Sequence, residues 1–301
     1  MHSKLLTYFE AIARHGSIRK AADALNVAPS AVNRHLLELE ALMGTALFDR
    51  LPRGVRLNAA GEILVHHARA TLRDFHRAQS EIEQLRTGMR GRLTVVSIES
   101  ALTDILPEAI RLFTERFPRI EIEVLGRPYG EAVQAVSDGV ADVAILFNTP
   151  PNLPLVNVAA ADFPLGIIVS PEHPLAVKKT AVLSDLIGHQ IIMPDPSITI
   201  FDQVEHVLAS SAVRLKPQIT SNSMAFMTNY VELGGAAGLA TPIGIGRKLR
   251  GGTLRFIPLQ DRGIPVQRLV GAVSDAAMPV AVANFCQHLK AFMPSWYLTL
   301  D

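Results

Sequence analysis

Residues 16–40 read GSIRKAADALNVAPSAVNRHLLELE and decide the fold of the amino-terminal part of the chain. Apolar residues at three- and four-residue steps predict a short helix over 18–25 and another that begins at Pro29 and ends near Gly44. Pro29 suits a first helical turn, where the amide hydrogen that proline lacks has no helical partner. Only Asn26-Val27-Ala28 separates the two patterns. Two short helices joined by so tight a turn predict a helix-turn-helix.

The outward face of the second predicted helix carries side chains that are suited to binding DNA. Its apolar stripe predicts one buried side, and Ser30, Asn33 and Arg34 lie on the other side, near the amino-terminal end. In a helix-turn-helix this end enters the major groove of DNA, where Arg can bridge guanine O6 and N7 and Asn can bridge adenine N6 and N7. The predicted DNA-binding residues of this segment are Ser17, Ser30, Ala31, Asn33 and Arg34.

A basic hairpin is predicted directly after these helices. Residues 47–57 read LFDRLPRGVRL, in which the Pro-Arg-Gly step is typical of a tip between two short strands. Arg50 and Arg53 flank the tip, and arginines in such a wing contact phosphates or the minor groove. We therefore predict a winged helix-turn-helix domain over residues 1–58, with further DNA contacts at Arg50 and Arg53. A helical bundle with a solvated arginine cluster is the alternative.

A long amphipathic pattern follows the hairpin. Apolar residues recur at steps of three or four from Leu64 to Leu85, with arginines on the polar sides. An apolar stripe of this length, with no domain around it, needs a partner, so we predict a homodimer through a linker helix over residues 59–88. A dimer sets two recognition helices about one DNA turn apart, or a multiple of it, which predicts a dyad-like binding site.

Residues 92–301 predict an α/β domain of two lobes. β-branched runs that alternate with helical periodicity indicate a parallel sheet. The chain then leaves this first lobe, builds a second set of strands and helices, and returns. The predicted lobes are lobe I over about 92–160 and 266–301, and lobe II over about 161–265. Two lobes joined by two crossings predict a hinged cleft.

Polar residues gather where the predicted strands of this domain end. Ligands of open α/β sheets bind beyond the carboxyl ends of the strands, often at helix amino termini. The positions that meet this description are Ser97, Glu99, Ser100, Thr103, Phe147, Asn148, Ser197, Thr199, Asn222, Ser223 and Pro242. We predict that they bind a small-molecule effector, although each hydroxyl is also typical of an ordinary helix N-cap.

Glu99 bears on the charge of that effector. A carboxylate in the cleft would repel an anion, so it favours a neutral, hydroxylated or cationic molecule. The alternative is that Glu99 turns to solvent.

The composition narrows the class of protein further. Apolar residues make up 49% of the 301 residues and charged residues 19%, a balance typical of a globular protein. Residues 1–90 hold 13 Lys and Arg against 9 Asp and Glu, which weakly favours a nucleic-acid partner for this part. No signal peptide or apolar membrane span is recognisable, so we expect a cytoplasmic protein without membrane association. The single cysteine, Cys286, allows no disulfide within the chain and is expected to be an inert core thiol.

Motifs that carry catalysis are missing from the sequence. It contains no Gly-x-Ser-x-Gly elbow, no phosphate loop and no His-Glu-x-x-His, and its histidines lack the spacing of metal ligands. We therefore predict no catalytic residue, no metal and no cofactor, and a protein that is not an enzyme.

The motifs of the amino-terminal winged helix-turn-helix domain (the head), taken together, resemble those of the LysR-type transcriptional regulators. The matching elements are GS-x₃-AA-x₂-L from Gly16, PSAV-x-R from Pro29, LFDR from Leu47 and L-x₃-GE from Leu57. The chain departs from the family at Asn33, where Ser is usual, and at Leu37, which is commonly polar.

The resemblance implies a bacterial regulator that binds double-stranded promoter DNA and responds to an effector between its lobes. It also implies an effector domain like a periplasmic binding protein, and homotetramers built as dimers of dimers. The alternative is a small-molecule binding module whose head recognises no specific DNA sequence.

Overall fold

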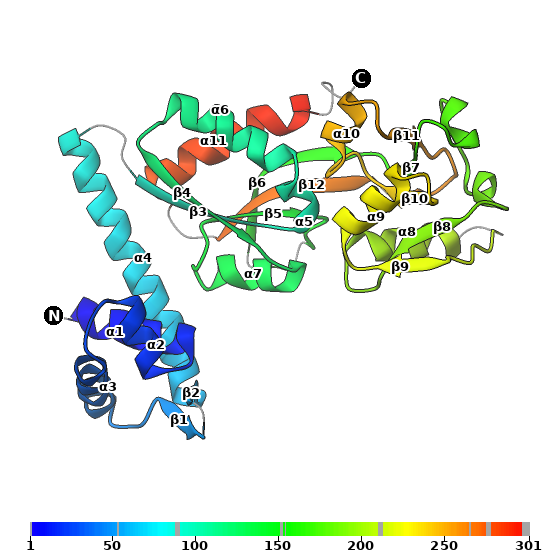
Figure 1. The fold of residues 1–301 in the computed structure, drawn as a ribbon. Helices are drawn as coiled ribbons and strands as arrows, with labels where there is room; N and C mark the ends of the chain where they lie inside the picture. Colours follow the sequence, from blue (N-terminus) through cyan, green and yellow to red (C-terminus); the bar gives the residue numbers. More distant parts are fainter. Residues whose placement is uncertain are drawn as a thin grey trace. The chain divides into compact units, whose positions relative to one another are not determined.

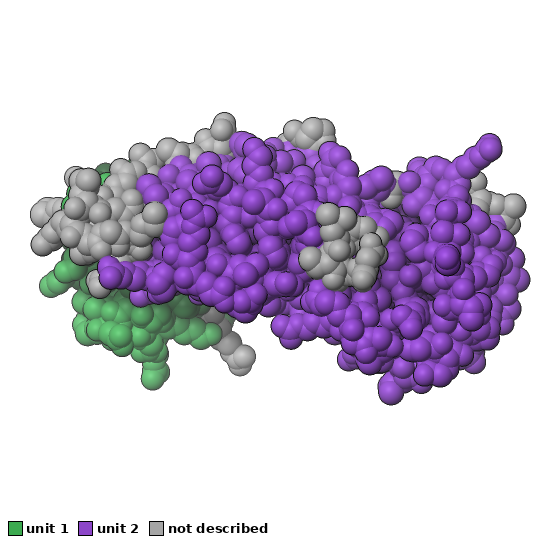
Figure 2. All heavy atoms as spheres, turned by 90° about the horizontal axis from the view of Figure 1, so that it is seen from above, with its two compact units in different colours: residues 1–88, 138–140 green, residues 89–137, 141–301 purple. Residues whose placement is uncertain are grey.

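The computed structural model of the chain describes residues 2–52, 54–87, 91–150, 153, 155–209, 213–264, 266–274 and 278–296. The chain folds as two compact units, residues 1–88 with 138–140 and residues 89–137 with 141–301, which have different colours in Figure 2.

The first unit begins with three helices and a hairpin. These elements are α1 (His2–His15), α2 (Ile18–Ala24), α3 (Pro29–Met43), β1 (Phe48–Leu51) and β2 (Gly54–Leu57). Ser17 caps α2 with its side chain, and Gly44 ends α3 in the left-handed conformation, at φ 70°. β1 and β2 pair antiparallel, with Phe48 opposite Leu57. The apolar faces of the three helices share one core around Phe9 and Ile12, both fully buried.

Helix α4 (Ala59–Thr87) follows the hairpin and packs its first turns on the same core through Val65 and Ala68. Asn58 fixes its start, because the Asn58 side chain accepts a hydrogen bond from the Gly61 N–H at 2.9 Å. At Gly61 the backbone approaches Leu47 so closely that an added Cβ would lie 2.1 Å from the Leu47 carbonyl oxygen. A glycine is therefore required where α4 meets the strand of the wing.

The second unit begins with lobe I, built on a sheet of strand order β4-β3-β5-β12-β6. Its strands are β3 (Gly91–Ser97), β4 (Ile120–Gly126), β5 (Val143–Phe147), β6 (Leu155–Phe163) and β12 (Gln267–Ser274). Its helices are α5 (Glu99–Leu102), α6 (Ile105–Arg116), α7 (Tyr129–Ser137) and α11 (Val280–Trp296). Figure 1 shows α6 and α11 on one face of the sheet and α7 on the other, so both faces are covered.

Lobe II is built on a second sheet, of strand order β11-β7-β10-β8-β9. Its strands are β7 (Gly166–Val169), β8 (Ile191–Pro194), β9 (Ile219–Ser221), β10 (Ala237–Ala240) and β11 (Arg255–Pro258). Its helices are α8 (Ile200–Ala209), α9 (Met224–Glu232), α10 (Gly246–Arg250) and the short 3-10 turns Pro174–Val177 and Leu183–Leu186. Neighbouring residues of β7 enter opposite cores: Ile167 joins the cluster that contains α8, and Ile168 joins the one that contains α9.

The sheets differ from the predicted parallel arrangement. β3 pairs parallel with β4 and with β5, but β12 pairs antiparallel with both β5 and β6. In lobe II, β7 pairs antiparallel with β10 and β11. The predicted parallel pairing is present at β3, β4 and β5, and antiparallel pairs are added where the chain reverses direction as it passes between the lobes. β6 was missed altogether, and it extends the sheet of lobe I to Phe163.

Two glycines in the first turns of helices provide a matched test of packing. Gly61→Ala should destabilise the protein by about 1–3 kcal/mol, because the added methyl group collides with a backbone oxygen that cannot move aside. Gly130→Ala, in α7, meets no atom within 4 Å and should be neutral or stabilising by up to about 1 kcal/mol. Thermal unfolding of the two variants beside the wild type measures the difference, and an unaltered Gly61→Ala midpoint would contradict the packing described here.

Candidate functional site

The outward face of α3 carries the side chains predicted to read DNA. Val32, Leu36 and Leu39 are buried in the head, which turns the opposite side of the helix to solvent. Ser30 and Arg34 are exposed, and Ala31 and Asn33 are half-buried on the same amino-terminal turns. Leu37, an apolar side chain, is 51% exposed on the next turn.

The other predicted DNA contacts lie at α2 and in the wing. The Ser17 hydroxyl accepts a hydrogen bond from the Lys20 N–H at 3.4 Å, as a helix cap does. Arg50 is exposed on β1, while Arg56 on β2 lies 3.8 Å from Asp49 in an ion pair. Arg53 lies outside the described residues. DNA contact by Ser17, Arg50 and Arg53 stays a prediction.

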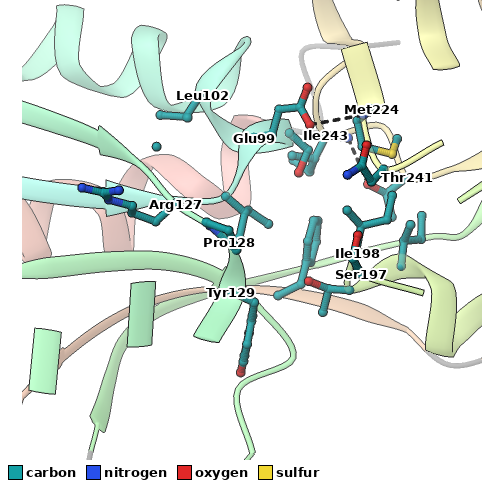
Figure 3. Close-up of a pocket in the computed structure, with 17 residues that line it drawn as sticks. Glu99, Leu102, Arg127, Pro128, Tyr129, Ser197, Ile198, Met224, Thr241 and Ile243 are labelled. Atoms are coloured by element: carbon teal, nitrogen blue, oxygen red, sulfur yellow. Dashed lines mark hydrogen bonds between the residues drawn. The ribbon is translucent and has the colours of Figure 1, made fainter. Parts of the chain in front are cut away.

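A cavity of about 590 Å³ lies in the second unit, between lobe I and lobe II (Figure 3). Its volume falls in the range of small-molecule sites. The cavity is lined by Ile98, Glu99, Ser100, Leu102, Gly126, Arg127, Pro128, Tyr129, Phe147, Ser197, Ile198, Thr199, Ile200, Asn222, Met224, Thr241 and Ile243. Six of these were predicted from the sequence, namely Glu99, Ser100, Phe147, Ser197, Thr199 and Asn222. The loops after β3, β5, β8 and β9 bring them together, as the strand-end rule requires.

Glu99 is exposed, and it reaches from α5 to the amino terminus of α9. Its carboxylate accepts hydrogen bonds from the Ser223 hydroxyl at 3.0 Å and from the N–H groups of Met224 at 3.2 Å and Ala225 at 3.3 Å. Figure 3 shows this contact at the edge of the cavity. The positive end of a helix is a favourable place for a carboxylate, so the negative charge of Glu99 is compensated within the protein.

Three of the predicted effector contacts instead hold the chain together next to the cavity. Ser97 is fully buried, and its hydroxyl donates to the Ile145 carbonyl at 3.3 Å. The Thr103 hydroxyl donates to the carbonyls of Ser100 at 2.8 Å and Gly244 at 3.2 Å. Ser223 is the N-cap of α9. None of the three is among the residues that line the cavity, and contact of their side chains with an effector stays a prediction.

Asn148 and Pro242 are also outside the set of residues that line the cavity. The Asn148 side chain donates to Gln267 Oε1 at 2.9 Å and accepts from the Arg268 N–H at 2.9 Å, and its backbone is left-handed, at φ 51°. Asn148 thus fastens the end of β5 to the start of β12. Pro242 is buried in the turn before α10, and the cavity wall there is formed by its neighbours Thr241 and Ile243.

The lining residues that the sequence did not reveal are mostly apolar. Ile98, Leu102, Ile198 and Ile243 look like ordinary core residues in the sequence, and no local signal sets them apart. Arg127 is different, because it follows β4 directly and the strand-end rule applied to that strand would have found it.

Asp104 makes a second carboxylate contact between the lobes. It is 3% exposed at the start of α6, and its Oδ1 accepts from the Ile105 N–H at 2.5 Å. Its Oδ2 accepts from the N–H groups of Gly246 at 2.7 Å and Gly244 at 3.1 Å, both in lobe II. Burial raises the pKa of Asp104, and the N–H groups that it accepts from oppose this effect.

The described part of the chain holds neither a metal-ligand cluster nor a membrane-spanning helix. Within it, no three His, Cys, Asp or Glu side chains are grouped so that they could hold a metal ion. None of the helices described has both the length and the apolar character needed to cross a membrane.

A winged helix-turn-helix joined to a two-lobed domain with a cavity between its lobes defines the class of ligand-responsive DNA-binding proteins. Comparison with protein families identifies the particular branch: residues 3–62 match the bacterial regulatory helix-turn-helix protein of the lysR family, and residues 86–294 match the LysR substrate binding domain. The chain belongs to the LysR family of transcriptional regulators.

Individual relatives agree with this assignment. A probable RuBisCO transcriptional regulator of Trichormus variabilis is 28% identical over 269 residues, which cover 87% of this chain and 79% of that protein. A variant of full-length OxyR from Pseudomonas aeruginosa has the same fold, with a TM-score of 0.76 at 18% identity over 96% of this chain and 94% of its own. Full-length CbnR in complex with its target DNA is also similar, with a TM-score of 0.66 at 21% identity. The match covers 97% of this chain and 99% of the CbnR chain.

Asp104 can be tested by a substitution that keeps its shape. Asp104→Asn places an amide NH₂ against backbone N–H donors, so a buried donor loses its partner, and we expect a loss of about 1–3 kcal/mol in unfolding free energy. Asp162→Asn removes the same charge from an exposed ion pair with Arg268 and should cost at most about 1 kcal/mol. Urea unfolding of both variants measures the loss in unfolding free energy of each. Equal losses for Asp104→Asn and Asp162→Asn would contradict the expectation.

Cys286 should be almost unreactive in the folded protein. Burial, together with the charge of Asp142, raises the pKa of this thiol from 9.0 to about 11. At pH 8 the thiolate is then about a hundredfold rarer than in the unfolded chain, and burial slows attack further. We expect reaction with a disulfide reagent at least about a hundredfold slower than in denaturant, where each pKa unit is a factor of ten in thiolate. Equal rates in the two states would contradict the buried position.

Proposed function

We propose that this LysR-family regulator recognises dyad-like promoter sites through α3 and the wing, and that a small molecule in the cavity between its lobes controls it. The observation that carries the proposal is the outward face of α3, where exposed Ser30 and Arg34 flank Asn33 on the amino-terminal turns. These side chains are suited to base edges in the major groove. Arg50 on β1 is suited to the phosphate backbone.

Effector control requires a site that joins two movable parts. The cavity has one wall in each lobe, and the lobes are connected by two crossings of the chain. A ligand that touches both walls binds one arrangement of the lobes better than another, which is the condition for shifting an equilibrium. Control would then reach the DNA through the spacing of paired heads and the bend that they impose.

Pairing of the heads is assigned to α4. Ile82 on this helix is 58% exposed in the single chain, although it belongs to the apolar stripe. A second copy of the helix would cover it, and two linked heads bind DNA more tightly than one because the second contact becomes intramolecular. We extend this to a homotetramer, on the resemblance to LysR-type regulators. Function on chromosomal DNA places the protein in the cytoplasm.

The proposal is tested first with DNA from the organism's own genome. The purified chain is incubated with fragmented genomic DNA at about 0.15 M salt, where nonspecific binding is weakened, and the retained fragments are sequenced. A dyad-like motif upstream of a few genes is the expected result. Retention of all sequences alike would favour a ligand-binding module without sequence-specific recognition.

A substitution on α3 tests the recognition face. Arg34→Ala should weaken binding to the retained site by about 1–3 kcal/mol while nonspecific binding changes little, because Arg34 is assigned to a base edge. Arg14→Ala is the matched control: it removes the same charge from the same domain at an exposed position that pairs with Glu10. Fluorescence anisotropy with specific and scrambled duplexes measures both. Equal losses for the two variants would show that only charge matters.

A further inference from the structure

The charges around the cavity restrict what it can hold. Glu99 and Arg127 are the charged side chains among the described lining residues, and the greater part of the remaining wall is apolar. The charge of the ligand that the cavity favours therefore depends on whether the side chains of Glu99 and Arg127 are available to bind it.

Glu99 is already committed to α9. The N–H groups of Met224 and Ala225 donate to its carboxylate, the Phe226 N–H donates to the Ser223 hydroxyl, and the Met227 N–H donates to the Ser223 carbonyl. The first turn of α9 thus has its N–H groups satisfied from within the chain. An anion at this end of the cavity would meet a carboxylate and would find the helix terminus occupied. A cation would have to draw Glu99 away from that terminus.

Arg127 does not offer its positive charge to an anionic ligand in the cavity. Figure 3 shows its guanidinium pointing away from the middle of the cavity, and Glu131 on α7 lies 3.8 Å from it. The polar groups left for a ligand are uncharged. Ser100 in lobe I and Thr199 and Asn222 in lobe II can each donate and accept hydrogen bonds.

We infer that the effector is an uncharged, mainly apolar molecule with one or two hydroxyl, carbonyl or amide groups, and that Glu99 excludes carboxylates by occupying the amino terminus of α9 itself. The inference rests on the proposed function, because it takes the cavity to be the effector site. Glu99 acts here as a specificity-determining residue. Its carboxylate stands where the carboxylate of an anionic ligand would otherwise bind.

Two probes that share the naphthalene ring and are of similar size separate the effect of charge from that of shape. 2-Naphthol is neutral at pH 7 and 2-naphthoate is an anion, and both fit a cavity of about 590 Å³. We expect calorimetric titration of the full chain, without DNA, to show naphthol binding at least about tenfold tighter than naphthoate. Glu99→Gln removes the charge from the helix terminus and should tighten naphthoate binding by about tenfold or more, while naphthol changes by less than about threefold.

Naphthol binding in the Glu99→Gln variant also reports that the cavity is intact. Glu115→Gln is the matched control, because it removes the same charge from an exposed position of lobe I outside the cavity lining, and it should leave the affinities for both probes unchanged. The inference is overturned if wild-type protein prefers naphthoate, if neither probe binds, or if Glu115→Gln alters naphthoate binding as much as Glu99→Gln does. Because the titrations contain no DNA, they can fail while specific DNA binding persists, and they can succeed in a chain that recognises no operator.

Discussion

Two carboxylates of lobe I hold backbone N–H groups of lobe II, and the cavity depends on this arrangement. Asp104 binds the turn before α10, and Glu99 binds the first turn of α9. In both cases the acceptor lies in the segment after β3 and the donors lie more than a hundred residues later in the chain. A carboxylate bound by several N–H groups is fixed in direction as well as in distance. These contacts set how the walls of the two lobes face each other across the cavity.

The head was predictable because its pattern is local. The stretch from Gly16 to Glu40 contains the caps, the turn and both apolar stripes of α2 and α3, so the helices follow from neighbouring residues. β6 was not predictable in the same way. Its sequence, LVNVAAADF, mixes small and polar residues, and it becomes a strand by pairing with β12, more than a hundred residues later. Strand direction has the same origin, since antiparallel pairing at β12 depends on where the chain returns.

The site was predictable only as far as strand ends mark it. That rule found Ser100, Thr199 and Asn222 because each follows a strand that ends at the cavity. It did not reveal that the Thr103 hydroxyl donates to Gly244, 141 residues away, because no sequence pattern shows that partner. It also could not reveal that the charge of Glu99 is compensated. The sequence suggested repulsion of anions by a bare carboxylate, whereas the structure gives that carboxylate a helix terminus, which changes the reason for the preference.

The two carboxylates differ in burial, and this difference bears on how the lobes can move. Asp104 is 3% exposed, so separating it from the α10 turn would leave buried donors and a buried charge without partners. Glu99 is exposed, so water can replace α9 as its partner at much smaller cost. We therefore expect the Asp104 contact to resist separation of the lobes more strongly than the Glu99 contact does. Glu99 lines the cavity and Asp104 does not. The contact that water can replace thus lies at the cavity, where a bound molecule would touch both lobes.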